Sequence, residues 1–162
     1  MKSLLVLRHA KSSWKHEGLA DHDRPLNRRG RHDAPRVGRL LREHELLPEV
    51  VLCSTAARAR GTLELLLEAA EWTCELRFSP ALYTASPADV VAAVRELPAR
   101  VGRALVVGHN PTLEELVREL SGREVALPTA ALVRLDWRGA DWREFGAGRP
   151  VELVELWTPK ES

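Results

Sequence analysis

Short apolar runs recur along this chain, and a segment with helical periodicity follows each of them. The runs at 4–7, 50–53 and 104–107 are four residues long and rich in valine and leucine, which is typical of buried parallel strands. A weaker strand signal covers 76–83. Because strands that alternate with helices build a sheet covered on both faces, we predict an α/β fold, a three-layer α/β/α sandwich.

Each intervening segment has a helix signal of its own. One helix is predicted before residue 48, with Asn27 as its N-cap and Pro35 as a kink or as its true start. Its apolar face would consist of Val37, Leu40, Leu41, His44 and Leu47. Three more helices are predicted, over 56–71 with Ser54 or Thr55 as the cap, from Ser86-Pro87 to about 97, and from Asn110-Pro111 to about 120.

Two further strands are predicted near the end of the chain, at 131–137 and 151–157. They are separated by a Gly-rich turn and can pair antiparallel. The prediction is therefore a mainly parallel six-stranded sheet with an antiparallel edge. We find no internal repeat or linker, so residues 1–162 are expected to form one domain.

Charge, hydropathy and cysteine spacing limit the kinds of partner and cofactor that the chain is expected to bind. The net charge is +1, so a broad basic surface for nucleic acid is not expected. The first apolar run is too short for a signal peptide or a membrane span, so we expect a cytoplasmic protein without membrane contact. Cys53 and Cys74 lack metal-site spacing, and we expect reduced thiols rather than a zinc site or a disulfide.

Polar residues of the same kind follow three of the predicted strands. Arg8-His9 ends the first, Ser54-Thr55 with Arg58 follows the second, and Gly108-His109 ends the fourth. Ligands of open α/β sheets bind at the carboxyl ends of the strands, so two arginines and two histidines are expected in one crevice. Each residue alone has an ordinary structural explanation, and only their recurrence at strand ends favours a site.

Such a crevice suits a phosphoryl dianion, since guanidinium groups match tetrahedral oxyanions. His9 could attack phosphorus if one ring nitrogen is unprotonated and the other is held by an acceptor such as a backbone carbonyl. His109 would then donate to the transferring phosphoryl group, and Arg8 and Arg58 would stabilise its charge.

Three motifs resemble those of the histidine phosphatase superfamily, the phosphoglycerate mutase-like proteins. They are Arg8-His9-Ala10 with Ser12, the stretch STAARARGT from Ser54, and VVGHN up to Asn110. The stretches RHAKSSW, DRPLN with Gly30, and VVGHNPTLEEL are similar to the SixA-type phosphohistidine phosphatases. The resemblance covers residues 4 to about 135.

The resemblance implies that His9 is the nucleophile and that Arg8, Arg58 and His109 complete a phosphate pocket. Ser12, Lys15 and Asn110 are expected to bind substrate, although Lys15 replaces an asparagine of many relatives and Ala10 replaces the motif glycine. No metal and no cofactor is implied. The implied partner is a phosphorylated protein, such as a phosphorelay or phosphotransfer histidine, or a small phosphorylated substrate.

A general acid is missing where ester-cleaving relatives have one. Residues 76–88 contain no carboxylate, Asp89 is predicted to lie in a helix, and Tyr83 is a weak acid. A phosphoramidate needs less help in leaving, so we predict a phosphohistidine substrate in an open, shallow site, unless Glu17, Asp21 or Asp23 folds over it. The alternatives are a phosphatase of small phosphorylated metabolites and a non-catalytic phosphate-binding regulatory module.

Overall fold

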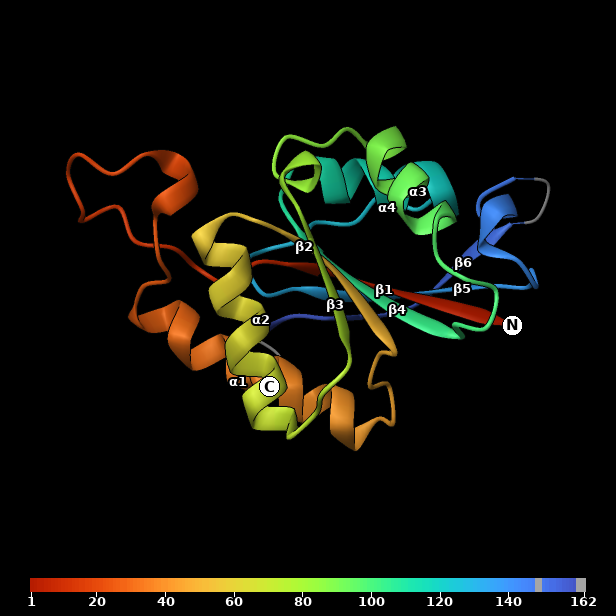
Figure 1. Cartoon of the computed structure of the whole chain (residues 1–162), viewed down its shortest axis with the longest axis horizontal. Coiled ribbons are helices and arrows are strands. Elements are labelled where there is room, and N and C mark those ends of the chain that lie inside the picture. The colour runs from red at the N-terminus through yellow and green to blue at the C-terminus, as the bar shows by residue number, and fades with distance from the viewer. Residues whose placement is uncertain (148–149, 160–162) are drawn as a thin grey trace.

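The computed structural model describes residues 1–147 and 150–159. Six strands form one mixed sheet in the order β3-β2-β4-β1-β5-β6 (Figure 1). Their bounds are Lys2–Arg8 (β1), Val50–Ser54 (β2), Glu75–Ser79 (β3), Arg103–Gly108 (β4), Leu132–Trp137 (β5) and Val151–Trp157 (β6). Strands β3, β2, β4 and β1 are parallel, and β5 and β6 are antiparallel. The predicted mainly parallel sheet with an antiparallel edge is confirmed.

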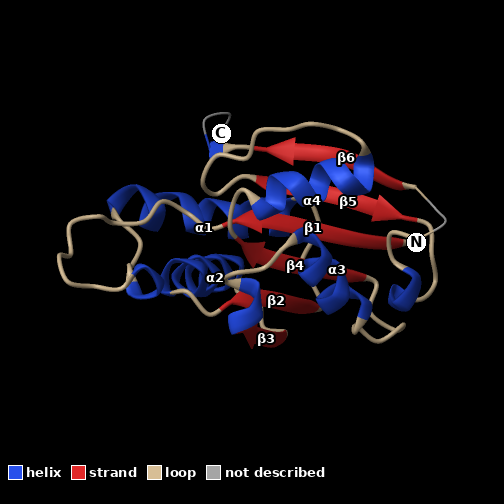
Figure 2. Cartoon of the chain, turned by 90° about the horizontal axis from the view of Figure 1, so that it is seen from above, coloured by secondary structure: helices blue, strands red, loops and turns tan. Residues whose placement is uncertain are grey.

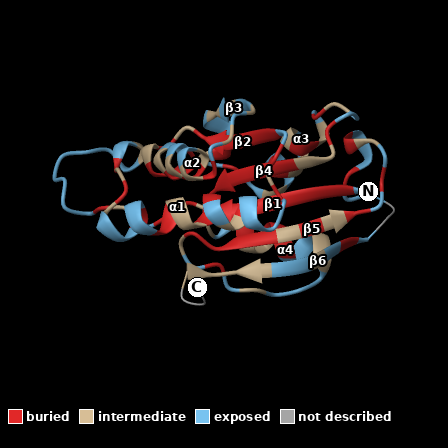
Figure 3. Ribbon diagram, turned by 90° about the horizontal axis from the view of Figure 1, so that it is seen from below, coloured by how far each residue is buried: buried red, intermediate tan, exposed pale blue. Residues whose placement is uncertain are grey.

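Helices cover both faces of this sheet. In Figure 1, α1 (Arg28–Glu43) and α2 (Ala57–Ala70) lie on one face, while α3 (Pro87–Arg95) and α4 (Thr112–Ser121) lie on the other. Because side chains alternate along a strand, β1 supplies both cores. Leu4 and Val6 belong to one buried cluster, and Leu5 and Leu7 belong to the other. Figure 3 shows the buried central strands between partly exposed helices.

The cap of α1 and the cap of α3 are confirmed. The Asn27 side chain accepts a hydrogen bond from the Gly30 N–H at 2.9 Å, and Ser86 forms a capping box with Asp89 at the start of α3. Pro35 lies inside α1 and does not mark its start. As expected, Asp89 lies in a helix, on its exposed first turn.

Two other helix starts differ from the prediction. The N-cap of α2 is Ala56, because the hydroxyls of Ser54 and Thr55 are bonded to histidine rings instead. The helix α4 begins at Thr112, so Pro111 occupies the cap and not the first turn. The third strand is also shorter than predicted, since Pro80, which has no N–H for a strand ladder, opens a turn of 3-10 helix (η2, Pro80–Leu82).

The amino end of the sheet is closed by an aromatic cluster. Trp137, Trp142 and Phe145 are at most 1% exposed, with ring centroids 5.5 to 6.4 Å apart. Trp137 pairs with Lys2, the first residue of β1, whereas Arg8 ends that strand. The packing cluster and the predicted site thus lie at opposite ends of the sheet. In the described residues, no helix has the length and apolar character needed to cross a membrane.

Candidate active site

Adjacent parallel strands bring the predicted residues of β1 and β4 together. Arg8 lies opposite Gly108 in the ladder, and the His9 N–H donates to the Gly108 carbonyl at 3.1 Å. The next residue on β4 is His109, whose ring centroid lies 5.1 Å from that of His9. The register of two central strands therefore sets the spacing of the two imidazoles.

His9 is buried and its protonation is defined by one contact. The residue is only 7% exposed, and its Nδ1 lies 2.7 Å from the carbonyl oxygen of Ala10. Because a carbonyl only accepts, Nδ1 carries the proton and Nε2 keeps its lone pair. Burial lowers the pKa of His9 to about 3, with smaller contributions from the charges of His109, Arg58 and Arg8. His9 is thus neutral near pH 7, as a nucleophilic nitrogen must be.

His109 has the same tautomer, but its free atom is a donor. Its Nε2 lies 2.8 Å from Ser54 Oγ, which also accepts a hydrogen bond from the Ala56 N–H at 3.2 Å. We assign the hydroxyl proton of Ser54 to His109 Nε2, which leaves the ring proton of His109 on Nδ1. Burial lowers the pKa of His109 to about 4, followed by the charge of Arg58. His109 is a neutral donor near pH 7.

Both arginines are anchored by some of their N–H groups and keep others free. Arg8 Nη1 donates to the Leu127 carbonyl at 3.0 Å, and Arg58 donates through Nη1 and Nη2 to Asp21. Among the described residues, Arg8 Nε, Arg58 Nε and His109 Nδ1 are buried without a hydrogen-bond partner. Buried donors are rarely left unsatisfied, so three of them beside a neutral His9 indicate an oxyanion site.

The fold adds Asp21, Tyr83 and His22 to this site. The sequence left open that Asp21 folds over it and indicated Tyr83 only as a weak acid, and His22 was missed. Asp21 Oδ2 accepts from Arg58 Nη2 at 3.0 Å and from the Tyr83 hydroxyl, and the Asp21 carbonyl accepts from Arg58 Nη1 at 2.8 Å. The Tyr83 ring lies 5.5 Å from the His109 ring and 4.9 Å from the His22 ring. His22 Nε2 in turn lies 2.8 Å from Thr55 Oγ1. Only the closeness of Asp21 and His22 to the DRPLN stretch could have indicated them.

The loop before α1 partly covers the site, so the expected open site needs correction. Residues 14–21 are exposed and project beyond the carboxyl end of the sheet (Figures 1 and 2). The loop then returns as a 3-10 turn, η1 (Asp21–Asp23), which places Asp21 against Arg58. Arg58 is consequently only 7% exposed.

The other predicted residues lie at the margin of the site. The Ser12 hydroxyl accepts from Arg24 Nη1 at 2.8 Å, and Lys15 belongs to the exposed part of the loop. Asn110 donates to the Leu127 carbonyl at 2.8 Å, the same oxygen that holds Arg8. Substrate binding by these three residues stays a prediction.

Cys53 follows the expected structural behaviour. It is completely buried, and burial raises the pKa of its thiol to about 12. Cys53 and Cys74 are both free thiols.

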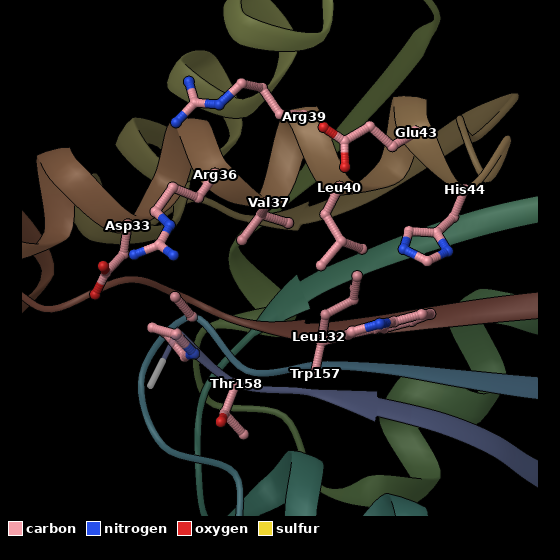
Figure 4. A pocket seen from close by; sticks show the side chains of 12 residues that line it. Asp33, Arg36, Val37, Arg39, Leu40, Glu43, His44, Leu132, Trp157 and Thr158 are labelled. Carbon is pink, nitrogen blue, oxygen red and sulfur yellow. The ribbon is translucent and has the colours of Figure 1, made fainter. Parts of the chain in front are cut away.

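A separate pocket of about 250 Å³ lies between α1 and the edge of the sheet (Figure 4). Val37 and Leu40 of α1 face Leu132 and Trp157 across it, with Asp33 at one end (Figure 4). Its link to the site is Ala130, whose N–H donates to the carbonyls of Arg8 and His9 at 3.1 Å. The pocket is therefore a neighbour of the oxyanion site and not part of it.

The fold and this arrangement define a phosphoryl-transfer protein of the phosphoglycerate mutase-like class. A sequence model of the histidine phosphatase superfamily (branch 1) matches residues 4–86. An uncharacterised protein of Arabidopsis thaliana is 32% identical over 152 residues, which span 88% of this chain and 70% of that protein. An uncharacterised protein of Mycobacterium leprae is 38% identical over 168 residues, which span 95% of this chain and all of that protein.

Among solved structures, a protein assigned as phosphohistidine phosphatase SixA from Nakamurella multipartitia is 31% identical, with a TM-score of 0.84 over 98% of this chain and 96% of that one. The chain belongs to the histidine phosphatase superfamily (branch 1) and is of the SixA type. The superfamily and the SixA-type structural match together support a phosphatase enzyme.

Proposed function

We propose that this protein is a metal-independent phosphohistidine phosphatase that works through a phosphorylated His9. The observation that carries the proposal is the neutral His9, with its Nδ1 proton on the Ala10 carbonyl, beside three buried donors that have no partner among the described residues. The resemblance to SixA-type proteins supports the same reaction. Arg8, Arg58 and His109 are the proposed phosphate ligands.

In the first step, the lone pair of His9 Nε2 forms a bond to phosphorus. The bond from phosphorus to the substrate nitrogen breaks, and its electron pair stays on that nitrogen. If the substrate imidazole was protonated beforehand, it leaves as a neutral ring, and no enzyme acid is required. The Ala10 carbonyl stabilises the phosphoimidazolium that forms on His9, and the free donors of Arg8, Arg58 and His109 stabilise the phosphoryl oxygens.

In the second step, water attacks the phosphorus of phospho-His9. A new phosphorus–oxygen bond forms, the bond to Nε2 breaks, and its electron pair returns to His9. Both hydrogens of the water leave with the product as dihydrogen phosphate, so His9 is restored in its original tautomer. The charges balance without a metal ion.

The carboxylate nearest the site supports a phosphoramidate substrate. The pKa of Asp21 is lowered, first by the hydrogen bond from Tyr83 and also by those from Arg58 and Arg24. The pKa of Tyr83 is raised, chiefly by its hydrogen bond to Asp21. Neither group is therefore an effective proton donor to an alkoxide at neutral pH, whereas a protonated phosphoimidazole brings its own proton.

The proposed partner is a phosphorylated histidine on another protein, such as a phosphorelay or phosphotransfer domain. Only the turn at Asp21–Asp23 returns over the site, while residues 14–21 of the loop are exposed, which supports access for a side chain of another protein. A cytoplasmic location and a single domain over residues 1–162 stay predictions.

The test is single-turnover hydrolysis of a phosphohistidine-bearing protein, an aryl phosphate and a sugar phosphate by wild type and His9→Ala. We expect preferential loss of phosphohistidine that disappears in the variant. Turnover restricted to the esters but still dependent on His9 would replace the substrate by small phosphorylated metabolites. Phosphate binding without any turnover would indicate the regulatory module.

A further inference from the structure

Asp21 binds the two terminal nitrogens of Arg58, one of the proposed phosphate ligands. Its carbonyl and its carboxylate occupy Arg58 Nη1 and Nη2, while Arg58 Nε stays buried and without a partner among the described residues. Arg24 Nε and the Tyr83 hydroxyl also donate to this carboxylate. An arginine can donate five hydrogen bonds, so Arg58 can hold Asp21 and a phosphoryl oxygen simultaneously. Asp21 need not leave when substrate binds.

Two contacts join the carboxylate to the site. Asp21 accepts hydrogen bonds from Arg58 and from Tyr83, and the Tyr83 ring lies 5.5 Å from the His109 ring. Attack by His9 expels the leaving group from the opposite side of phosphorus. With the phosphoryl group held by Arg58 and His109, the leaving group would enter the space beside Asp21 and Tyr83.

We propose that Asp21 is a specificity-determining residue which selects phosphoryl groups on a cationic leaving group, and above all a protonated phosphoimidazole. The inference rests on the proposed function and concerns the leaving-group side of the same site. A fixed negative charge there stabilises the protonated ring, which is the form that leaves without an enzyme acid. The same charge disfavours substrates with a second anionic group beside the scissile bond.

The aromatic rings around Asp21 fit this assignment. Tyr83 donates to the Asp21 carboxylate, and its ring meets that of His22 edge to face at 87°. A planar imidazolium can pack against such rings while its N–H donates to Asp21. Tyr83 thus helps to hold Asp21 and lines the same space.

The test compares phosphoimidazole with 4-nitrophenyl phosphate, whose phenolate leaves without a proton. We expect Asp21→Asn to lower the ratio of kcat/KM for phosphoimidazole to kcat/KM for the aryl ester about tenfold, the effect of one pKa unit on the bound ring. Any disturbance of Arg58 affects both substrates and cancels in the ratio. In this variant, the alkaline limb of the kcat–pH profile for phosphoimidazole should also shift to lower pH by about one pH unit.

Two further variants sharpen the comparison. Asp21→Glu keeps the charge and should restore the ratio to within about threefold of wild type. Glu17→Gln removes a carboxylate from the exposed part of the same loop and should leave both the ratio and the pH profile unchanged. Circular dichroism checks that each variant is folded.

The outcomes separate this inference from the proposed function. His9-dependent hydrolysis of phosphoimidazole with an unchanged ratio in folded Asp21→Asn would overturn the role of Asp21 alone. An equal fall of the ratio in Glu17→Gln would also overturn it, because the effect would then come from net charge. Failure of wild type to hydrolyse both phosphoimidazole and a phosphohistidine-bearing protein would overturn the proposed function itself.

Discussion

At the residue scale, the chemistry depends on which nitrogen of each buried histidine carries the proton. The Ala10 carbonyl assigns the proton of His9 to Nδ1, and the Ser54 hydroxyl assigns that of His109 to Nδ1 as well. His9 is left with a free lone pair at Nε2, whereas the free atom of His109 is a donor. Two identical side chains thus acquire opposite roles from one neighbouring oxygen each.

Ser54→Ala tests the assignment of His109. Without the hydroxyl, Nε2 loses its donor, and the ring can place its proton on either nitrogen. We expect kcat to fall about tenfold, less than the roughly 100- to 1000-fold loss for complete removal of an oxyanion donor, because the His109 ring keeps its proton on Nδ1 for part of the time. Nitrogen NMR of the His109 ring should show a mixed tautomer. Ser79→Ala, which removes the cap of an exposed turn, is the matched control and should change neither measurement.

The stability of the fold should fall in mild acid because of the same two residues. The pKa values of His9 and His109, about 3 and about 4, lie below that of an unfolded histidine. Between about pH 4 and 6.5 the unfolded chain binds more protons, so stability is present above that window and is lost as pH falls through it.

Lowering the pH from about 7 to about 5 should therefore cost up to about 2 kcal/mol for each of the two histidines, measured by urea unfolding. His9→Gln should reduce this pH dependence. The exposed His32 offers the control, because His32→Gln should leave the slope unchanged. A wild-type protein as stable at pH 5 as at pH 7 would contradict the assignment.

At the element scale, the helices were easier to predict than their ends. Asn27 and the Ser86-Pro87 pair act locally, and both were correctly interpreted as caps. Ser54 and Thr55 also have side-chain oxygens suited to an N-cap, but their hydroxyls bond to His109 and His22, which lie 55 and 33 positions away. Tertiary contacts with the two histidines therefore replaced the capping role that local chemistry predicted for Ser54 or Thr55.

The crossing of α1 and α2 gives an element-scale prediction. A Cβ at Gly38 would lie 2.0 Å from the Leu66 carbonyl oxygen, which is a backbone atom and cannot move aside without shifting α2. We expect Gly38→Ala to destabilise the protein by about 1–3 kcal/mol, measured by denaturant unfolding. At Gly61 a Cβ would meet only the Leu26 side chain at 3.4 Å, so Gly61→Ala should be neutral or stabilising by up to about 1 kcal/mol. Similar effects of the two substitutions would argue against the close crossing.

At the scale of the whole molecule, stability and chemistry lie at opposite ends of one sheet. The seven residues of β1 separate the aromatic cluster from the site by roughly 20 Å, at about 3.3 Å per residue. Trp142 anchors the packed end, because its Nε1 donates to the Val101 carbonyl at 2.7 Å. Within the described residues, the site end carries three buried side-chain nitrogens without a partner, those of Arg8, Arg58 and His109, while Trp137 Nε1 and Arg103 Nε lack one at the packed end.

Trp142→Phe should therefore weaken the fold without changing the reaction. Loss of the indole hydrogen bond, which leaves the Val101 carbonyl with one donor fewer, should lower the free energy of unfolding by about 1–2 kcal/mol. The value of kcat/KM for an aryl phosphate at room temperature should stay within about twofold of wild type. A large loss of activity in a stably folded variant would show that the two ends are coupled.

The sequence by itself predicted the layers, the mainly parallel sheet with its antiparallel edge, and Arg8, His9, Arg58 and His109 as the candidate site residues. These features depend on local periodicity and on the rule that parallel strands present their carboxyl ends together. Only the tertiary structure decided the tautomers of the two histidines and the arrival of Asp21 and Tyr83 at the site. The contacts of Asp21 join residues 37 and 62 positions apart through a loop that has no periodic pattern, so no local signal specifies them.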